Sequence, residues 1–386
     1  MNNKFVHSGD NLFTKEGITV AKIDNNPYIL NDQFSQTIKI NNIVPYFEHC
    51  YRITTTSGTV TLPKTSIIPN ITYGDFHKVY GYDKKIINTR VDQLEEGNIL
   101  ITPFLFKTEQ SENTPLYIDI FDVVLNHVND NFDGYIVKCE DEDVVIYSTN
   151  GKKMVPYKRY QPAKSLLNIM AWYITEGWSS KQFLKNPSAS KFLSSFTQSI
   201  YKNMENTENI CEDLKNLGIP ISISKHQKYF NNAPLEVTYQ FNSCISVLMQ
   251  TCGWRSDEKK IPDWIMGFLI SNPSYINEFV ATLIEGDGHY DPISNIYSYS
   301  SKSFELIKQI TFLIRLLGMY VKYSKQKSQH VIAFGSKNRK IGLVRFKNFA
   351  MTKILNIEDT GEQECLELIL DKPGNIFVGS LGNIMI

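Results

Sequence analysis

The sequence of 386 residues lacks the features that direct a chain into or across a membrane. Residues 1–11 contain no apolar segment of the kind found in a signal peptide. No apolar run elsewhere approaches the roughly 18 residues that a membrane-spanning helix requires. Hydrophobic residues nevertheless make up 42% of the chain and aromatic residues 12%, which is typical of globular proteins rather than of disordered chains. We therefore expect a globular chain of two or three domains that has no membrane partner and is not secreted.

Paired cysteines are also missing. The six cysteines, at positions 50, 139, 211, 244, 252 and 365, are scattered and form no Cys-x-x-Cys pair. This spacing argues against a zinc site and against a disulfide framework. We expect reduced thiols in a cytosol-like compartment.

The whole chain carries no net charge, since 40 basic residues balance 40 acidic ones. The charges are unevenly distributed along the chain. Residues 156–345 contain 23 Lys and Arg against 14 Asp and Glu, a net charge of +9. The remainder of the chain carries −9. A basic segment of this kind suits a phosphate-rich partner such as a nucleic acid. A solvated basic surface is an equally good interpretation of the charge alone.

Two segments of similar pattern lie in this basic part, IMAWYITEG at residues 169–177 and VATLIEGDG at residues 280–288. Each is an apolar run without proline that ends in an acid and a glycine, which predicts a helix closed by a left-handed glycine. Small residues four positions apart share one face of each helix. They are Ala171 and Thr175 in the first segment and Thr282 and Gly286 in the second. We expect the helices to pack closely through these residues, so that Glu176 and Asp287 emerge together.

Such a pair of acids needs a counter-charge. A carboxylate at the C-terminal end of a helix faces the negative end of the helix dipole, and a second carboxylate beside it adds repulsion. We therefore expect a cation between Glu176 and Asp287. Carboxylate oxygens suit Mg²⁺ (or Mn²⁺), which keeps several waters and bridges phosphate oxygens. Two acids that hold such a metal beside a phosphodiester provide the arrangement for metal-assisted strand cleavage.

The two segments resemble the paired signature helices of the LAGLIDADG homing endonucleases. The second keeps the GDG sequence and has Glu285 at the earlier acidic position, whereas the first has Glu176 for the usual Asp and Thr175 for Ala or Gly. The resemblance implies a double-stranded DNA substrate, hydrolysis of phosphodiester bonds assisted by a divalent metal, and staggered breaks at a long asymmetric site. Glu176 and Asp287 would bind the metal, and each would serve the cleavage of one strand.

The same part of the chain contains an internal repeat. After each acid follow a helical stretch, a Leu-Gly pair, an apolar residue, an alternating run and a Ser-Lys pair, and Gly218 and Gly318 are 100 positions apart. Each half is thus predicted as a signature helix, strands, a helix, a Leu-Gly turn and strands, at about 156–250 and 251–345. Two halves in one chain imply a monomer with pseudo-twofold symmetry, which matches the two antiparallel strands of DNA.

Alternating strands in each half are the predicted DNA-binding surface. Segments 219–229 and 235–242 are expected to form a hairpin, with 294–300 and 319–334 as their counterparts. A two-stranded ribbon fits the major groove, where polar side chains and lysines reach base edges and phosphates. For the strands taken alone, an ordinary polar sheet face is the alternative. The lysines expected to bind DNA are Lys225, Lys228, Lys325, Lys327, Lys337 and Lys340.

A lysine is expected to assist catalysis. Lys259 and Lys260 precede Ile-Pro in DEKKIPDWI, and Lys259 fits the position slightly better. The resemblance implies that a basic residue there lies near the metals, where an ammonium could stabilise the phosphorane charge or orient the attacking water. A bare Lys-Lys pair is otherwise surface charge. Lys337 and Lys340 are the candidates for the matching residue in the second half.

Other conspicuous side chains of this region are not assigned to the site. His289 directly follows the second signature segment, but a lone exposed histidine is more often neither a ligand nor a catalyst. The tryptophans are expected to pack in cores or between modules rather than to stack on bases. They are Trp172, Trp178, Trp254 and Trp264.

The two ends of the chain resemble a second family, the Hint fold of inteins and hedgehog autoprocessing modules. SGDNLFTKEG, YRITTTSGTVTLPKTSIIP and LEEGNILITP are similar to its opening blocks, and KILNIEDTGEQECLELILDKPGNIFVG is similar to its closing ones. Residues that splicing requires are missing, since Val6 stands at the position of the nucleophile and Lys64 at that of the histidine. The chain also ends in GNIMI, without the His-Asn pair. No splicing nucleophile is assigned, although repurposing of His7 or Ser8 stays open.

These patterns predict a mixed α/β (α+β) protein. An all-β Hint-like domain is expected from residues 1–110 and 346–386, an acidic, irregular insertion or linker from 111–155, and an αββαββα endonuclease domain from 156–345. The predicted function is site-specific double-strand cleavage of DNA with Mg²⁺ (or Mn²⁺), with protein splicing lost. The expected location is the cytoplasm with access to the nucleoid, or a compartment that holds host DNA. The alternatives are a maturase-like protein that binds DNA or RNA without cutting it, and an autoprocessing protein.

Overall fold

The computed structural model describes most of the chain. The described residues are 3–7, 11–14, 17–20, 28–30, 37–55, 58–71, 87–103, 115–148, 150–179, 193–199, 204–219, 223–224, 229–230, 233–234, 236–335, 345–346, 349–371, 377–378 and 384–385. Four lysines predicted to bind DNA lie outside them, namely Lys225, Lys228, Lys337 and Lys340.

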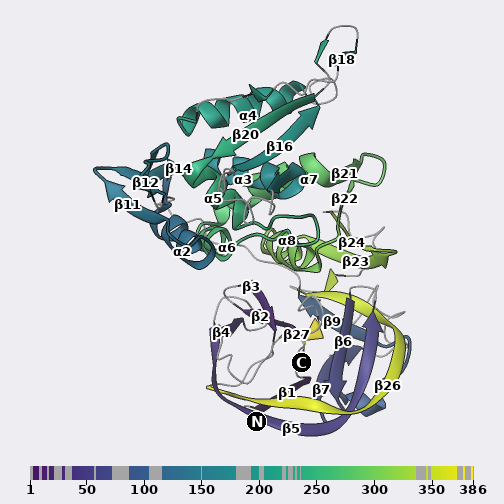
Figure 1. The fold of residues 1–386 in the computed structure, drawn as a ribbon. Coiled ribbons are helices and arrows are strands. Elements are labelled where there is room, and N and C mark those ends of the chain that lie inside the picture. The colour runs from purple at the N-terminus through teal and green to yellow at the C-terminus, as the bar shows by residue number, and fades with distance from the viewer. Residues whose placement is uncertain are drawn as a thin grey trace. The chain divides into compact units, whose positions relative to one another are not determined.

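The chain divides into two compact units (Figure 1). One unit comprises Met1–Thr108, Tyr290–Ser300 and Ile307–Ile386, and the other comprises Glu109–His289 and Ser301–Leu306. Among the described helices, none has the length and apolar character to cross a membrane.

In the described residues, the two ends of the chain share one sheet, to which 13 strands belong. The long strands β5 (Thr37–Thr55) and β26 (Phe349–Leu370) pair along most of their length, and β1 (Asn3–His7) and β9 (Ile99–Pro103) also pair with β26. Apolar side chains that alternate along these strands form one buried core. The other elements of the sheet are β2 (Asn11–Thr14), β3 (Gly17–Val20), β4 (Tyr28–Leu30), β6 (Gly58–Pro63), β7 (Ile67–Ile71), β8 (Ile87–Arg90), β25 (Arg345–Phe346), β27 (Phe377–Val378) and β28 (Ile384–Met385), and a 3-10 turn spans Val91–Gln93.

The segment expected to be irregular is folded in its described residues 115–148, so the prediction is wrong for that part. It contains β10 (Tyr117–Asp119), α2 (Phe121–Asn131), and a hairpin of β11 (Ile136–Glu140) and β12 (Asp143–Tyr147). Two buried valines four positions apart, Val124 and Val128, give α2 an apolar stripe that its Asp and Asn content obscures in the sequence. The segment pairs with the residues that follow it in the sequence. β10 pairs with β14 (Tyr160–Pro162), and β12 pairs with β13 (Tyr157–Lys158).

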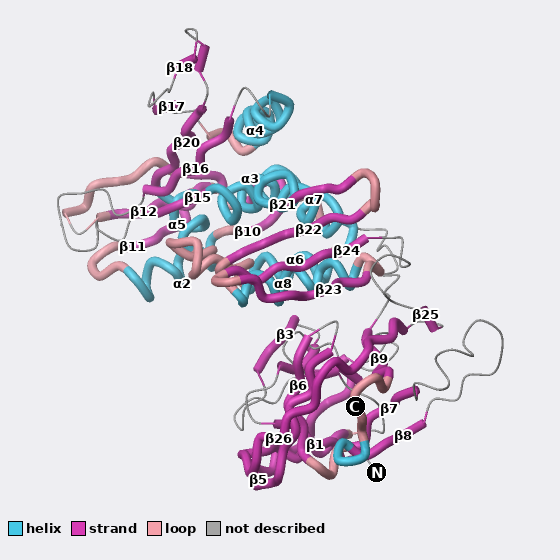
Figure 2. The backbone as a smooth tube through the Cα atoms, turned by 90° about the vertical axis from the view of Figure 1, so that its right-hand side faces the viewer, coloured by secondary structure: helices cyan, strands magenta, loops and turns pink. Residues whose placement is uncertain are grey.

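The predicted repeat is present in the order of the elements (Figure 2). In the first half α3 (Ala163–Glu176) leads directly into β15 (Gly177–Ser179), and the sheet order is β15-β16-β20-β17. In the second half α7 (Ile276–Asp287) leads directly into β21 (Gly288–Asp291), and the sheet order is β21-β22-β24-β23. The equivalent elements that follow are β16 (Leu193–Ser199), α4 (Met204–Asn216), β17 (Ile223–Ser224) and β20 (Glu236–Asn242), and then β22 (Ile296–Ser301), α8 (Phe304–Leu316), β23 (Tyr320–Gln326) and β24 (Gln329–Gly335).

The topology corrects one predicted correspondence. The pair of β17 with β20 in the first half is confirmed, but its counterpart is the hairpin of β23 and β24, which lies almost wholly within 319–334. Segment 294–300 instead supplies β22, the equivalent of β16. The remaining elements are β18 (Tyr229–Phe230) and β19 (Ala233–Pro234), which pair with each other, α5 (Ser243–Gln250), α6 (Asp263–Ser271) and a 3-10 turn at Pro273–Tyr275.

The two Leu-Gly turns have the same geometry. Gly218 has φ +65° and Gly318 has φ +72°, the left-handed region that favours glycine. Each glycine N–H donates to a carbonyl three residues back, and the next N–H donates to one five residues back. This hydrogen-bond pattern closes α4 and α8 in the same way, so the sequence repeat corresponds to a structural one.

The predicted contact between the two signature helices is confirmed. A Cβ atom added to Gly286 of α7 would lie 2.3 Å from Thr175 Oγ1 and 2.6 Å from Thr175 Cβ of α3. The side chain of Thr175 in α3 thus packs directly against the backbone of α7 at Gly286. Asn168 of α3 extends the contact, since its Oδ1 accepts from Thr282 Oγ1 at 3.5 Å and its Nδ2 donates to Glu278 Oε1 at 3.4 Å.

The glycines that follow the two helices do not have the predicted left-handed conformation. Gly177 has φ −90° and Gly288 has φ −91°, because the chain continues directly into a strand. Glycine is required there for a different reason. An added Cβ would lie 2.3 Å from Tyr173 O at Gly177, and 2.6 Å from Ile284 O at Gly288.

We expect Gly286→Ala to destabilise the protein, by about 1–3 kcal/mol, because the new methyl overlaps Thr175. Gly267→Ala is the matched control, since it lies within helix α6 and a Cβ there meets nothing within 4 Å. That change should be neutral or stabilising by about 0.5–1 kcal/mol. Urea unfolding of both variants measures the difference. Equal stability of the two variants would contradict the close helix contact.

Candidate metal and phosphodiester site

The helix contact determines where the two acids lie. Thr175 and Gly286, which touch, are each followed at once by an acid, Glu176 in α3 and Asp287 in α7. The acids therefore leave the same end of the helix pair from adjacent positions. Both residues are exposed, so that a ligand from solvent can reach them.

Each carboxyl group has an altered affinity for protons. The protein atoms around the Glu176 carboxyl group exclude part of the bulk water from it and raise its pKa to about 7. The negative charge of Asp287 acts in the same direction. The pKa of Asp287 is also raised by partial burial, although the nearby Lys259 opposes the shift. Two acids with raised pKa values at helix C-terminal ends indicate a site short of positive charge.

Of the two candidate lysines, Lys259 is the one whose charge acts on Asp287. Its side chain is 3% exposed, its Nζ donates to Tyr173 O at 3.0 Å, and Nζ lies 3.5 Å from the centre of the Tyr173 ring. Burial lowers the pKa of Lys259 to about 7, against the opposing charges of Cys252 and Asp287. The ammonium is thus held in the last turn of α3, where carbonyl groups and a ring face attract it.

A short loop fixes the position of Lys259. Gly253 has φ +94°, and a Cβ there would lie 2.3 Å from Glu258 O, so only glycine fits. Lys260 N donates to Cys252 O at 2.9 Å and closes the loop. Tyr173 OH donates to Gly253 O at 3.2 Å, which ties the loop to α3.

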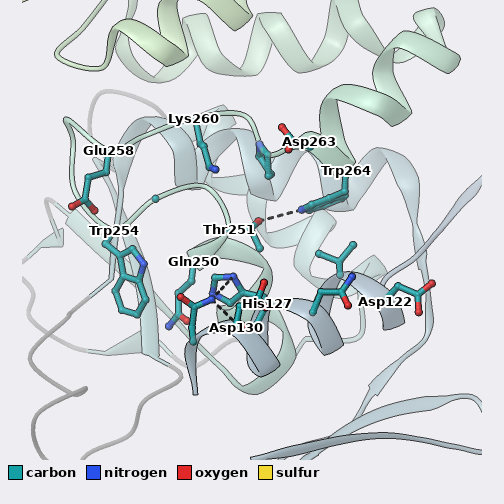
Figure 3. A pocket seen from close by; sticks show the side chains of 15 residues that line it. Asp122, His127, Asp130, Gln250, Thr251, Trp254, Glu258, Lys260, Asp263 and Trp264 are labelled. Carbon is teal, nitrogen blue, oxygen red and sulfur yellow. Dashed lines mark hydrogen bonds between the residues drawn. The ribbon is translucent and has the colours of Figure 1, made fainter. Parts of the chain in front are cut away.

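Lys260 has different surroundings. It is exposed and lines a cavity of about 650 Å³ between α2, the end of α5 and the start of α6 (Figure 3). Glu258, Asp263 and the rings of Trp254 and Trp264 also line this cavity, whereas Lys259, Glu176 and Asp287 do not. Of the two candidate lysines, the geometry favours Lys259.

The acid pair fits a divalent metal ion. The two carboxylates supply hard oxygen ligands, and a cation would offset the repulsion that raises the pKa of Glu176. Among the residues that the structure describes, no group of three His, Cys, Asp or Glu side chains could hold a metal. The remaining ligands would therefore be water and substrate oxygens, as Mg²⁺ prefers.

The first-half sheet has one buried face and one open polar face. Phe196 and Tyr239 form a directly opposed pair on the buried face. On the other face the half-buried Thr197 and Thr238 oppose each other with their Oγ1 atoms 2.9 Å apart. Ser195 opposes Gln240 on this face, but Ser195 is only 2% exposed, so Gln240 is the accessible member of that pair. Hydroxyl and amide groups in such rows suit hydrogen bonds to base edges.

The second-half hairpin carries lysines on both faces. Val321 and Phe334 are opposed and buried, so Lys325, opposite His330, shares their face near the tip of the hairpin. Lys327 has φ +52° in the turn between β23 and β24 and is exposed. Both lysines stay predicted DNA contacts.

The sequence analysis missed Lys322 and left two roles open for Trp178. Lys322 is exposed and directly follows the buried Val321, so it belongs to the open face, and strict alternation from Val321 would have identified it. Trp178 is 52% exposed, so it does not pack in a core, which was one of its two expected roles, whereas Trp172 is buried as expected.

No protein-family model matches the chain, and no curated protein sequence matches it. Among solved structures, the homing endonuclease I-DmoI in complex with its target DNA and in the presence of manganese is similar over 46% of this chain and 90% of its own. The identity is 10% and the TM-score 0.32. The N-terminal LAGLIDADG domain of DUF199/WhiA is similar over 61% of this chain and 96% of its own, with 9% identity and a TM-score of 0.28.

Full-length DUF199/WhiA from Thermatoga maritima is similar over 48% of this chain and 57% of its own, with 10% identity and a TM-score of 0.27. At these TM-scores the likenesses do not decide the family. The interpretation of the site therefore depends on its own residues. None of these three structures is that of a Hint domain.

We expect Glu176→Gln to stabilise the metal-free protein at pH 8 and to leave its stability unchanged near pH 4. A raised carboxyl pKa means that the ionised form costs folding free energy, and this cost grows from the unfolded pKa near 4.5 to the folded value of about 7. Added Mg²⁺ should raise the thermal midpoint of the wild type more than that of the variant, because the ion binds the ionised carboxylate. Thermal unfolding at both pH values checks this. A variant that responds to Mg²⁺ like the wild type would remove Glu176 from the metal site.

Proposed function

We propose that the protein is a site-specific endonuclease that makes staggered double-strand breaks in DNA by metal-assisted phosphodiester hydrolysis. The observation that carries the proposal is the contact between Thr175 and Gly286. It sets one acid from each half of a structural repeat at the shared end of two helices. A duplex presents two antiparallel strands, and a repeated module with two acids suits one cleavage on each strand. The net charge of +9 in residues 156–345 suits the phosphate backbone.

The chain's own groups have separable roles in the proposed reaction. Glu176 and Asp287 would hold Mg²⁺ (or Mn²⁺), which when bound supplies Lewis-acid stabilisation of phosphate charge. Lys259, with a pKa of about 7, can carry or release a proton near neutral pH. Its place beside Asp287 suits charge stabilisation or the orientation of the attacking water. Polar side chains of the open sheet faces would align the duplex before cleavage.

We expect Asp287→Asn and Lys259→Met to bind DNA and to lose double-strand cleavage, by about 10²-fold or more. Loss of a carboxylate ligand weakens the metal, and loss of the ammonium removes a charge beside it. Lys260→Met is the matched control and should cut like the wild type, because Lys260 lines the separate cavity. The substrate is a duplex that joins the DNA sequences on either side of the gene, assayed on gels with Mg²⁺ and by anisotropy for binding.

Three results would contradict parts of this assignment. Full cutting by Asp287→Asn would show that another group holds the metal. An equal loss of cleavage in the Lys259 and Lys260 variants would mean that Lys259 has no special role in catalysis. Tight binding with intact product at every divalent metal would favour the alternative function, a binding protein of the same fold.

For the β-rich ends we propose a Hint-like module that has lost protein splicing. Val6 is fully buried in β1, where it is paired with Leu366 of β26, and its side chain has no nucleophilic atom. Lys64 is exposed, with its Nζ 3.9 Å from Asp92 Oδ2. These two positions carry neither the nucleophile nor the proton-transfer group that splicing needs.

We expect the expressed chain to keep its full mass on prolonged incubation at neutral pH, with or without a thiol nucleophile. Intact-mass spectrometry checks this. Val6→Ala should behave in the same way. Release of an amino-terminal or carboxy-terminal fragment from the wild type would identify an autoprocessing protein and overturn the structural role.

A further inference from the structure

An exposed tryptophan lies next to the acid pair. Trp178 is the second residue of β15, two positions after Glu176, and its side chain is 52% exposed. Two residues of extended chain span at most about 7 Å, which is the length of one or two nucleotide steps along a DNA strand. The Cα atoms of Glu176 and Trp178 are therefore no further apart than about two nucleotide steps.

The orientation of Trp178 is fixed by its neighbours in the strand. Ser179 is 5% exposed, and its Oγ lies 2.6 Å from Tyr173 OH and 2.6 Å from Ser194 Oγ. Side chains alternate along a strand, so the indole points to the opposite face. Gly177 on its other side packs against Tyr173 without room for a Cβ. This local packing holds the indole on the outward face of the strand.

The face that Trp178 shares is the open polar face of the first-half sheet. Trp178 opposes Ser195, and Ser195 opposes Gln240, so the three residues form one row across the sheet, in which Ser195 is only 2% exposed and Gln240 is half-buried. The opposed pair Thr197 and Thr238 continues this face. β15 is an edge strand of the described sheet, so the indole stands at the edge of a face whose accessible polar side chains are Gln240, Thr197 and Thr238.

An exposed aromatic ring on a polar sheet face is a combination that binds a nucleotide by stacking and hydrogen bonding.

We propose that Trp178 packs against a nucleotide of bound duplex DNA beside the phosphate that Glu176 serves, as a positioning residue. The inference rests on the proposed function and adds the contact that sets the register of the DNA on the acid pair. The indole stacks on a sugar or on a partly unstacked base, and burial of its large apolar surface favours the correctly placed duplex. It takes no part in the transfer of protons.

The second half has a different side chain at the equivalent position. His289 is the second residue of β21, as Trp178 is of β15, and it is also exposed. An imidazole presents a smaller apolar face than an indole. The two strands of the duplex would therefore be held unequally, and the strand at the Glu176 half would be positioned more firmly.

The test uses the intrinsic fluorescence of the full-length chain, which contains four tryptophans. The probe is the duplex that joins the DNA sequences on either side of the gene, in EDTA so that it stays intact. Binding is followed independently by the anisotropy of a fluorescein label on the same duplex. We expect DNA to quench tryptophan emission in the wild type and in Trp254→Phe, whose indole lines the separate cavity. We expect most of this quenching to be lost in Trp178→Phe.

Affinity and cleavage supply the second measurement. Trp178→Ala should lower DNA affinity and single-turnover cleavage about tenfold, whereas Trp178→Phe should recover most of both, because a phenyl ring can still stack. The pH profile of cleavage should not change in either variant. Thermal midpoints equal to that of the wild type are expected for both, since the replaced side chain is exposed.

The outcomes separate the inference from the function on which it rests. The role of Trp178 alone would be overturned if the wild type binds and cuts the duplex but Trp178→Phe shows the same quenching as the wild type. The same conclusion would follow if Trp178→Ala binds the duplex with wild-type affinity. A wild-type chain that neither binds nor cuts the duplex would overturn both proposals.

Discussion

The structure of the site depends on one close approach between two helices. Thr175 and Gly286 touch so tightly that no side-chain atom fits on Gly286, and everything beyond them follows from that contact. The next residue of each helix is an acid, and the residue after each acid is a glycine at which the backbone changes direction and enters a strand. One contact therefore determines the position of the acids and the starting point of both sheets.

The electrostatics of this arrangement are unfavourable without a partner. Two carboxylates at helix C-terminal ends repel each other, and partial removal from water together with the charge of Asp287 raises the pKa of Glu176 to about 7. Lys259 is buried at a cost that lowers its own pKa to about 7. Folded chains seldom keep such groups together without a reason in binding or chemistry. A divalent cation and a phosphate together would satisfy both the acids and the ammonium.

Sequence reasoning predicted the helix pair and the repeat because both depend on local pattern. Small residues four apart identify a helix face that can approach another, and Leu-Gly identifies a left-handed helix end. Sequence reasoning was wrong where tertiary packing determines the conformation or the exposure of a residue. The conformation of Gly177 depends on Tyr173 above it, and helix α2 is recognisable only once Val124 and Val128 are known to be buried. The choice between Lys259 and Lys260 required the loop closed at Gly253, and the exposure of Trp178 required the register of β15 on β16.

The halves of the repeat are alike in topology and unlike in chemistry. Glu176 stands where its counterpart is Asp287. The buried Lys259 opposes the rise in the pKa of Asp287, whereas partial burial and the charge of Asp287 both raise the pKa of Glu176. On the neighbouring strands an indole in one half corresponds to an imidazole in the other. A perfectly symmetric pair of sites would bind a palindrome and treat its strands alike. Divergence at the acids and beside them instead suits a duplex with two different halves, since each strand then meets its own acid and its own positioning side chain.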